Sequence, residues 1–549
     1  SLAGADATLF SNFKIYNLLA LGNDHTLDFT DTTVASTFSL VNGENYKFSF
    51  GGTEFHGFNN VTSSYIPIEG DLLNTLAGSN QADSFSEISG DGLTANGIVF
   101  SDIGTVNAGL GDDDIEHTQT DWDIQTASNK TKVGSINFTG IDTVNKDNSL
   151  NTTNRTLTGT TGDDAFASDS ENAVSANGIT YYGIGTVDAS DGEDDVQNDS
   201  ASWAIQDANA TSINGIAFSN IESINKNNSA GITNRILNGT AGQDLLTIHS
   251  ANAISAKGIT YYGIGSVDAL GNSTADLDTV SGSTTWNLLA SGFEAFDISF
   301  AGVEIANSAA GGTLNGTAAA DKFVVAGTQS VAANGTTFNQ VTSVTASDGD
   351  DDVQYDSLDW TIQGTNATSI EGIAFTDVES INKFNSTDIT NRNLNGTTGQ
   401  DLLNIEGTNA ISANGITYYG IGSVDALGNS EADFDTVSGS TSWNLLVEGF
   451  GVFGINFTGV EIANSGAAGT LNGTTAADKF VVAGTQSVAV NGTTFNQVTS
   501  VTAGDGDDDV QSDVVNWTIE GEKSTTVNGI AFSGIESINK FNSTDTTNR

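Results

Sequence analysis

The chain has 549 residues, including 63 Gly and one Pro, and it contains neither Cys nor Met. Its 68 acidic and 16 basic residues give a net charge of −52, which excludes a basic face for nucleic-acid phosphates and disfavours an anionic membrane surface. The hydrophobic content of 37% is regularly placed, so the chain is expected to fold, and without an apolar run of bilayer-spanning length it is not expected to insert into a membrane.

Self-similarity organises the chain into six repeats that follow a degenerate partial one. Each full repeat opens with a variant of Leu-Asn-Gly-Thr and carries one Trp. Repeats three and four recur almost unchanged as repeats five and six, displaced by 157 residues (443 − 286 for their first tryptophans). One continuous array therefore replaces the three or four globular domains that about 150 residues per domain would suggest. The boundaries are 1–74 for the partial repeat, then 75–155, 156–235, 236–312, 313–392, 393–469 and 470–549.

A shorter template recurs inside the repeats, for example at 177–188 and 214–225. Its apolar residues alternate and are mainly β-branched or aromatic, and Asn-Gly or Asp-Gly separates the copies, which predicts strands and turns without helices. We expect an all-β fold, a parallel β-solenoid with about four rungs of ~20 residues per repeat, forming a rod on the order of 130 Å. The alternative is a string of small β-sandwich domains, although half a repeat is too short for a self-sufficient sandwich.

Two Gly-Asp phrases recur along the array. The first contains one Asp, and we interpret it as a structural turn in which a short carboxylate and Gly support the backbone. It supplies Asp83, Asp164, Asp244, Asp321, Asp401 and Asp478.

The second phrase is rich in Asp in repeats one, two, four and six, and it is shortened in repeats three and five. Calcium takes six to eight oxygen ligands, and a Gly-rich turn can present carbonyls beside carboxylates. These phrases therefore predict structural Ca²⁺ sites, although solvated Asp-Gly turns remain the alternative interpretation. The candidate metal ligands are Asp112, Asp113, Asp114, Asp191, Asp194, Asp195, Asp348, Asp350, Asp351, Asp352, Asp505, Asp507, Asp508 and Asp509.

The phrases resemble single copies of the RTX nonapeptide, Gly-Gly-x-Gly-x-Asp-x-apolar-x. The neighbouring segment 214–224 is similar to rungs of very large, repetitive bacterial surface proteins and adhesins. This resemblance covers residues 75–549 in pattern. It implies type I secretion, a location outside the cell or at the bacterial surface, and calcium held between stacked turns.

Catalysis in a repeat array would require a cluster of titratable residues that breaks the repeat. The four Arg all close the phrase Thr-Asn-Arg, at positions 155, 235, 392 and 549, where we expect them to pair with Asp across rungs. We find no repeat-breaking basic and acidic cluster, so the sequence favours a non-enzyme over a β-helical polysaccharide lyase. The single Trp of each repeat is expected to fill the core in preference to stacking on sugars.

These observations lead to one functional hypothesis and one alternative. The hypothesis is a non-catalytic, secreted structural protein, an elongated rod in a bacterial extracellular fibre, surface layer or adhesin, which self-assembles into a homo-oligomer or filament. The alternative is an adhesin module that binds surface glycans. Neither nucleic acid nor membrane insertion is expected.

Overall fold

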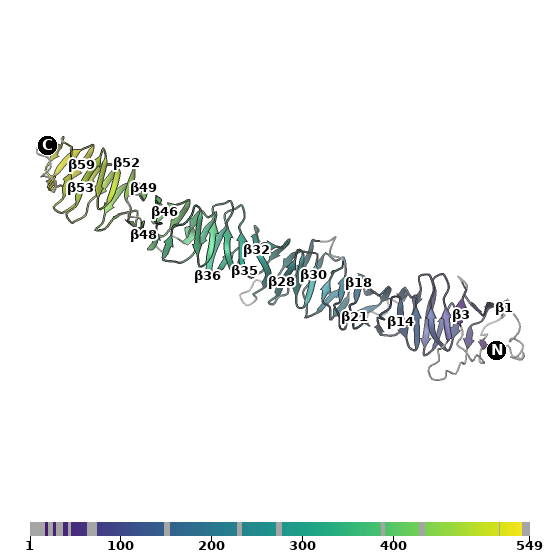
Figure 1. Cartoon of the computed structure of the whole chain (residues 1–549). Helices are drawn as coiled ribbons and strands as arrows, with labels where there is room; N and C mark the ends of the chain where they lie inside the picture. The colour runs from purple at the N-terminus through teal and green to yellow at the C-terminus, as the bar shows by residue number, and fades with distance from the viewer. Residues whose placement is uncertain are drawn as a thin grey trace. The chain divides into compact units, whose positions relative to one another are not determined.

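The computed structural model describes residues 17–19, 26–28, 37–41, 45–62, 74–147, 154–227, 233–270, 277–385, 390–427, 434–514 and 516–540. Its strands form parallel stacked coils, a β-solenoid of about 14 turns, so the predicted fold class is confirmed (Figure 1). Among these residues the only helical element is the 3-10 turn η4 (Lys383–Asn385). None of the described segments forms a helix that is long and apolar enough to cross a bilayer. The chain divides into two compact units, 1–271 and 272–549.

In the first unit, each coil contributes strands to two stacks. In one stack, Leu76 pairs in parallel with Val106, which pairs with Phe138. That stack contains β7 (Asn74–Ala77), β11 (Ile103–Asn107) and β15 (Ile136–Thr139), and the other contains β8 (Ser84–Ser89), β12 (Asp114–Ile115) and β16 (Thr143–Val144). The next coils repeat the pattern with β17 (Arg155–Thr158), β21 (Ile184–Asp188) and β25 (Ile216–Ser219), and with β18 (Ala165–Ser170), β22 (Asp195–Gln197) and β26 (Ser223–Ile224).

The second unit has the same two stacks. In one stack, Leu314 pairs in parallel with Val344, which pairs with Phe375. In the other stack, Phe323 pairs in parallel with Val353, which pairs with Ile381. The strands of the first stack are β35 (Ile305–Asn315), β38 (Thr336–Thr345) and β42 (Ile373–Thr376), and those of the second are β36 (Lys322–Gly327), β39 (Asp352–Gln354), β43 (Ser380–Ile381) and β47 (Ile416–Tyr419). Repeats five and six add β44 (Arg392–Asn395), β49 (Thr436–Leu445), β52 (Ile462–Asn472), β55 (Thr493–Thr502) and β56 (Asp509–Gln511).

The expected rung of ~20 residues is wrong, because antiparallel hairpins interrupt the parallel coils. β19 (Ala173–Ala176) and β20 (Ile179–Tyr182) form such a hairpin, with Ala176 opposite Ile179. The two connecting residues, Asn177 and Gly178, have φ values of 48° and 85°, as a type I′ turn requires. The Asn-Gly pairs therefore close hairpins within a coil, and parallel partners such as Phe323 and Val353 are 30 residues apart (353 − 323).

The core consists of the inward-facing residues of both stacks. Strands show alternating burial, and Leu314, Val344, Phe375, Phe323 and Val353 are all fully buried. Alternation places every second side chain inside, which explains why a chain with a modest apolar content can fill a solenoid interior. Five tryptophans have an exposed fraction of 4% or less, which confirms their core role: Trp122, Trp203, Trp286, Trp360 and Trp443. The sixth, Trp517, is partly exposed.

Candidate functional site

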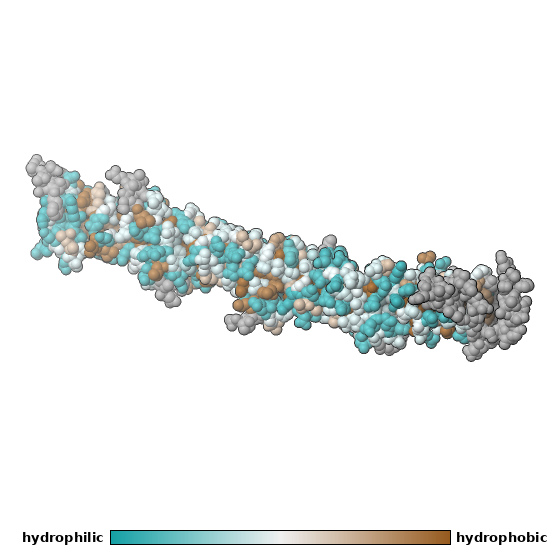
Figure 2. All heavy atoms as spheres, turned by 60° about the horizontal axis from the view of Figure 1, so that its bottom comes forward, coloured by the Kyte–Doolittle hydropathy of each residue, from teal (hydrophilic) through white to brown (hydrophobic). Residues whose placement is uncertain are grey.

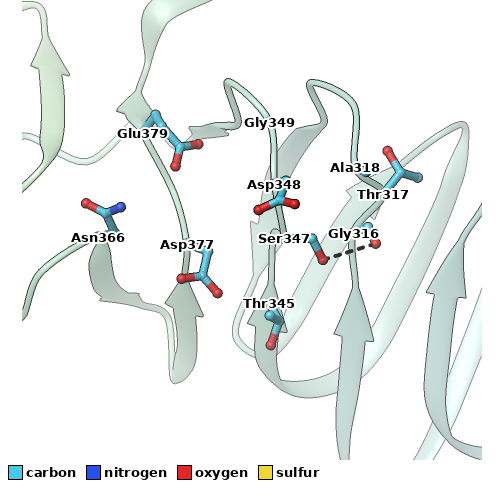
Figure 3. A pocket seen from close by; sticks show the side chains of 10 residues that line it. All are labelled: Gly316, Thr317, Ala318, Thr345, Ser347, Asp348, Gly349, Asn366, Asp377 and Glu379. Atoms are coloured by element: carbon cyan, nitrogen blue, oxygen red, sulfur yellow. Dashed lines mark hydrogen bonds between the residues drawn. The ribbon is translucent and has the colours of Figure 1, made fainter.

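The Gly-Asp phrases lie at the corner where the chain passes from one stack to the other. In repeat four, residues 316–321 connect β35 to β36, residues 346–351 connect β38 to β39, and residues 377–379 connect β42 to β43. We call these three stacked turns of each repeat the acidic corner. In repeat four the corner includes a polar pocket of about 680 Å³ (Figure 3).

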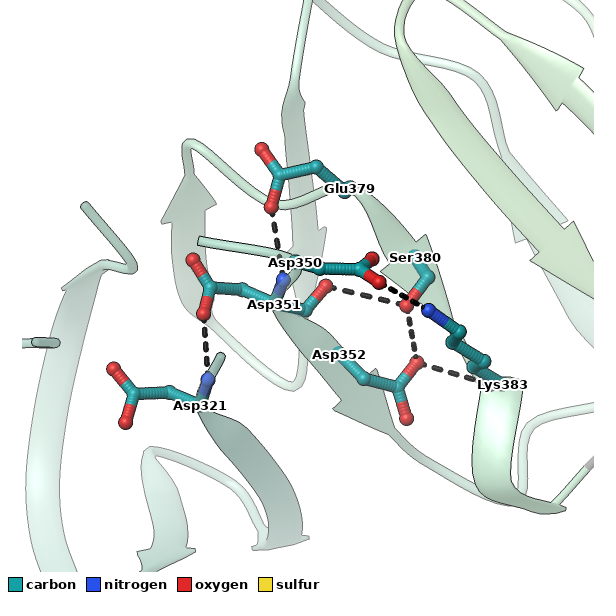
Figure 4. A network of polar contacts seen from close by, with 7 residues as sticks. All are labelled: Asp321, Asp350, Asp351, Asp352, Glu379, Ser380 and Lys383. Atoms are coloured by element: carbon teal, nitrogen blue, oxygen red, sulfur yellow. Dashed lines mark hydrogen bonds and ion pairs between the residues drawn. The ribbon is translucent and has the colours of Figure 1, made fainter. Parts of the chain in front are cut away.

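Asp351 and Glu379 each bind the backbone of the preceding turn, and Asp321 binds the backbone of its own turn. Asp321 accepts the Thr317 amide of its own turn at 2.6 Å, and the Asp321 amide donates to Asp351 Oδ1 at 2.7 Å. The Asp351 amide then donates to Glu379 Oε2 at 2.9 Å (Figure 4). These charge-assisted bonds join three successive coils, and each contributes roughly 1.5–3 kcal/mol. The single-Asp phrase is therefore a structural turn, as the sequence favours.

The same carboxylate ladder recurs in the other repeats. In repeat five, for example, the Asp401 amide donates to Asp435 Oδ1 at 2.7 Å and the Asp435 amide to Glu461 Oε2 at 2.9 Å. The remaining ladders that lie within one unit are Asp83–Asp113–Asp142, Asp164–Asp194–Glu222, Asp278–Glu304 and Asp478–Asp508–Glu536.

The neighbouring carboxylates of an Asp-rich phrase have different partners. Asp350 forms an exposed ion pair with Lys383. Asp352 Oδ1 accepts the hydroxyl of Ser380 and the amide of Lys383, both at 2.9 Å. The equivalents of Asp350 in repeats one and six also bind a Lys ammonium, and the equivalents of Asp352 bind a Ser or Thr hydroxyl: Asp112 with Lys146, Asp507 with Lys540, Asp114 with Thr143, Asp195 with Ser223, and Asp509 with Ser537.

The middle carboxylate of the ladder is fully buried, as Asp351 illustrates. Its Oδ1 accepts a hydrogen bond, whereas its Oδ2 is buried with no hydrogen-bond partner among the described residues. Burial raises the pKa of Asp351 to about 6, against the opposing effect of the Asp321 amide, and the nearby Glu379 carboxylate adds to the rise. Burial likewise raises the pKa of Asp113 and Asp194 to about 6, and it raises that of Asp508. At neutral pH the corners of repeats one, two, four and six therefore contain a charge that its surroundings disfavour.

The geometry bears directly on the predicted calcium sites. One ion would require six to eight oxygens around a common point, but Asp350, Asp351 and Asp352 are directed to a Lys, to a backbone amide of another coil and to a Ser. Within the described ranges there is no group of three or more His, Cys, Asp or Glu side chains positioned for one metal ion. As arranged, these residues do not fit the RTX-type calcium site, and calcium binding stays a prediction that melting with calcium or a chelator tests.

The remaining candidate residues lie at the surface of the corner. Asp348 is exposed and lines the pocket of repeat four, and its equivalents Asp191 and Asp505 follow the strands of repeats two and six in the same way. Glu379 and Lys383, which contribute to the corner, are not among the candidate residues predicted from the sequence. A signal for both exists, because the phrase Glu-Ser-Ile-Asn-Lys occurs 28 residues after Asp351 (379 − 351) and equally after Asp194 and Asp508.

The Arg residues are buried at the junctions between repeats. Arg235 Nη2 lies 3.8 Å from Asp199 Oδ1 and Arg392 Nη2 lies 3.9 Å from Asp356 Oδ1, so the expected pairing with Asp exists there at long distance. Burial lowers the pKa of both guanidinium groups. Arg155 is also buried and donates to the Tyr182 carbonyl at 3.3 Å, and Arg549 lies outside the described residues.

Comparison of the chain with protein-family models and with curated proteins finds no match.

Proposed function

We propose that this chain is a non-catalytic structural segment of a secreted bacterial protein that belongs to an extracellular fibre, a surface layer or an adhesin. The observation that carries the proposal is the carboxylate ladder, because it joins consecutive coils in repeat after repeat. A residue set used once would suggest a specific reaction, whereas a residue set used in every repeat serves the stacking of the coils themselves.

The distribution of charge supports an exposed, soluble structure. On the face that Figure 2 displays, the described surface is mainly hydrophilic or intermediate, with small separate hydrophobic patches. A net charge of −52 favours solubility and repels other acidic surfaces, and the Lys–Asp pairs of the corner compensate part of it locally. This combination suits a protein that extends into the medium and displays its ends.

We propose self-association of the chain as part of this structural role.

Sedimentation velocity over a range of concentrations, combined with small-angle scattering for the elongated form, tests the proposal. We expect the wild-type chain to associate increasingly as its concentration rises. A wild-type chain that stays monomeric at high concentration, with and without calcium, contradicts self-assembly.

Glycan binding through a row of tryptophans lacks support, since five of the six side chains are buried. The adhesin alternative then depends on polar surfaces. A glycan array probed with the full chain is its direct test.

A further inference from the structure

The Asn-Gly pairs of the chain can undergo a reaction that depends on how each pair is held. The backbone nitrogen of the Gly can attack the side-chain carbonyl carbon of the Asn, because Gly has no Cβ to obstruct a close approach. The ring that forms is a succinimide, and the side-chain nitrogen leaves as ammonia. The reaction requires a side-chain amide that is free to turn toward the backbone and a Gly N–H that no hydrogen bond holds.

The Asn-Gly pairs that open repeats three to six do not meet the second requirement. Their Gly amides lie in the parallel ladder, where each donates to a carbonyl of the next coil, so the attack would break a hydrogen bond between coils. These bonds are all 2.7 Å long: Gly239 to Asp268, Gly316 to Thr345, Gly396 to Asp425 and Gly473 to Thr502. We therefore expect these pairs to persist unchanged.

Most pairs that close hairpins do not meet the first requirement. Asn177 Nδ2 donates to the Gln125 carbonyl of an earlier coil at 2.9 Å, and rotation of this side chain toward Gly178 would break that bond. The Asn side chains of other hairpins are held in the same way at 2.7–3.4 Å, Asn96 by a carboxylate and the rest by a carbonyl: Asn96 by Asp83, Asn214 by Ser168, Asn334 by Leu289, Asn414 by Gln363 and Asn491 by Leu446.

The pair Asn528-Gly529 meets both requirements. It closes the hairpin of β58 (Ser524–Val527) and β59 (Ile530–Ser533), with φ values of 49° and 74°. Among the described residues the Asn528 side chain has no hydrogen-bond partner, and the Gly529 N–H donates to no acceptor. Asn528 is half-buried and Gly529 is exposed, so water reaches both residues.

A difference between repeats two and six explains why Asn528 is not held. Asn214 occupies the same position in repeat two, 314 residues earlier (528 − 214), which is twice the offset of 157. Its Nδ2 donates to the carbonyl and the hydroxyl oxygen of Ser168, at 3.0 and 3.3 Å. At the position of Ser168, repeat six has Val482 (168 + 314), which has no hydroxyl. Repeat six thus keeps the turn but lacks an acceptor that holds its Asn in repeat two.

We propose that Asn528 is a site of spontaneous modification, at which the side chain reacts through a succinimide to give isoaspartate and aspartate. Gly529 N forms a bond to Asn528 Cγ, the bond from Cγ to Nδ2 breaks, and the Gly529 N–H proton leaves with the ammonia. Water then opens the ring. Its attack on the main-chain carbonyl carbon gives isoaspartate, and its attack on Cγ gives aspartate. This modification is separate from the structural role proposed above.

Either product changes the last described coil, 516–540. The new carboxylate adds one negative charge to it, and isoaspartate also adds one carbon atom to the backbone of the turn. A two-residue turn fixes the register of the strands that it joins. We therefore expect the hairpin of β58 and β59 to be less stable after conversion to isoaspartate.

The test is incubation of the full chain in mildly alkaline buffer, followed by proteolysis and mass spectrometry of every Asn-Gly peptide, with an isoaspartyl methyltransferase to label the isoaspartate. Asn214 is the matched site within the same chain, because residues 214–219 and 528–533 have the same sequence. We expect Asn528 to convert at least about tenfold faster than Asn214, equivalent to about 1.4 kcal/mol in activation free energy. In urea no side chain is held by the fold, and we expect the two rates to become equal.

One substitution tests the role of the missing acceptor. Val482→Ser gives repeat six the hydroxyl that Ser168 provides in repeat two, and we expect Asn528 to convert more slowly, toward the rate of Asn214. Val481→Ser is the matched control, because it makes the same change at the adjacent residue, whose side chain is exposed, and should leave the rate unchanged.

Three results overturn the proposal. The first is an equal rate at Asn528 and Asn214 in the folded chain. The second is a faster rate at Asn528 that persists in urea, because the fold would then not be its cause. The third is a Val482→Ser chain, folded by circular dichroism, in which Asn528 converts at the wild-type rate.

Discussion

The fourth and fifth repeats share one carboxylate ladder but close their coils differently. Asp321, Asp351 and Glu379 in repeat four have the same hydrogen bonds, at 2.7 and 2.9 Å, as the equivalent residues of repeat five. In repeat four a loop separates β39 from β40 (Asp359–Thr361), whereas in repeat five β49 is one strand of ten residues. The ladder is thus the common requirement for stacking, and the Asp-rich phrase is an addition to it.

The tryptophans of the two repeats also differ, in the hydrogen bonding of their indole nitrogens. The Trp443 indole donates to Ser465 Oγ at 2.9 Å, whereas the Trp360 indole nitrogen is buried with no hydrogen-bond partner among the described residues. The continuous strands of repeat five bring a Ser to the core beside Trp443. In repeat four the Trp360 ring instead makes an edge-on contact with the Tyr355 ring.

The largest effect on stability is expected from Gly316→Val, which disrupts a turn that both repeats share. A Cβ at residue 316 would lie 2.2 Å from the Ala346 carbonyl oxygen and 2.9 Å from Asp321 Oδ2, and at Gly396 in repeat five the matching carbonyl would be 2.5 Å away. Either substitution should lower the free energy of unfolding by about 3 kcal/mol or more in urea titrations. Gly364→Ala is the control, because its nearest neighbour would be 3.7 Å away. If repeat five tolerates the change, the ladder is not a common requirement.

The second prediction concerns the buried charge of Asp351. Its pKa of about 6 lies above the ordinary value of 3.8, so the folded state binds this proton more tightly than the unfolded chain does. Between about pH 4 and 6 stability therefore falls as the pH rises, and the full loss is present above pH 6. Asp351→Asn keeps an acceptor for the Asp321 amide and should raise the free energy of unfolding by about 2 kcal/mol at pH 7, but not at pH 4.

Chemical unfolding at several pH values measures this effect. Asp348→Asn, at an exposed carboxylate three residues away, is the control and should leave the profile unchanged. A profile for Asp351→Asn that runs parallel to the wild type contradicts the assignment of this carboxyl.

The third prediction separates the two tryptophans. Trp443→Phe removes a buried hydrogen bond and leaves the Ser465 hydroxyl without it, whereas Trp360→Phe removes an indole nitrogen that lacks a partner. The volume change is the same, so we expect Trp443→Phe to be more destabilising by about 1 kcal/mol in urea unfolding. Equal losses would show that packing alone decides the cost.

The smallest effect is expected from Lys383→Ala. The Lys383–Asp350 pair is partly exposed, and exposed ion pairs contribute about 0–1 kcal/mol. We expect a loss of about 0.5 kcal/mol that disappears in 1 M salt, measured by thermal melting. A loss above about 2 kcal/mol would make the Asp-rich phrase as important as the ladder.

The sequence predicted the solenoid because repetition leaves little choice of fold. Identical phrases must occupy identical environments, and the alternating apolar residues around Phe323 and Val353 can only face a shared interior. The predicted rung length was wrong. Asn177-Gly178 and the equivalent pairs close antiparallel hairpins within one coil, so the strands of a hairpin were counted as separate rungs. The residue types of a turn identify such pairs as hairpin turns, but they do not show where in a coil the hairpin lies.

The sequence predicted where the candidate site lies in a coil, but not which groups its carboxylates bind. The Asp-rich phrases do lie at one corner of the coils, yet the direction of each carboxylate depends on partners about 30 residues away, such as the Asp321 amide and Ser380 for Asp351 and Asp352. Once the coils stack, the side chains of adjacent residues bind different partners. A count of Asp residues in one phrase therefore overstates the ligands that one ion could reach.

By itself, then, the sequence determined the repeat, the all-β fold, the buried tryptophans and the acidic corner, because each follows from local periodicity and composition. Only the tertiary structure decided from which backbone amide each carboxylate accepts a hydrogen bond. The physical reason is that hydrogen bonds and burial depend on the residue in the next coil. That neighbour is known only after the register of stacking is set.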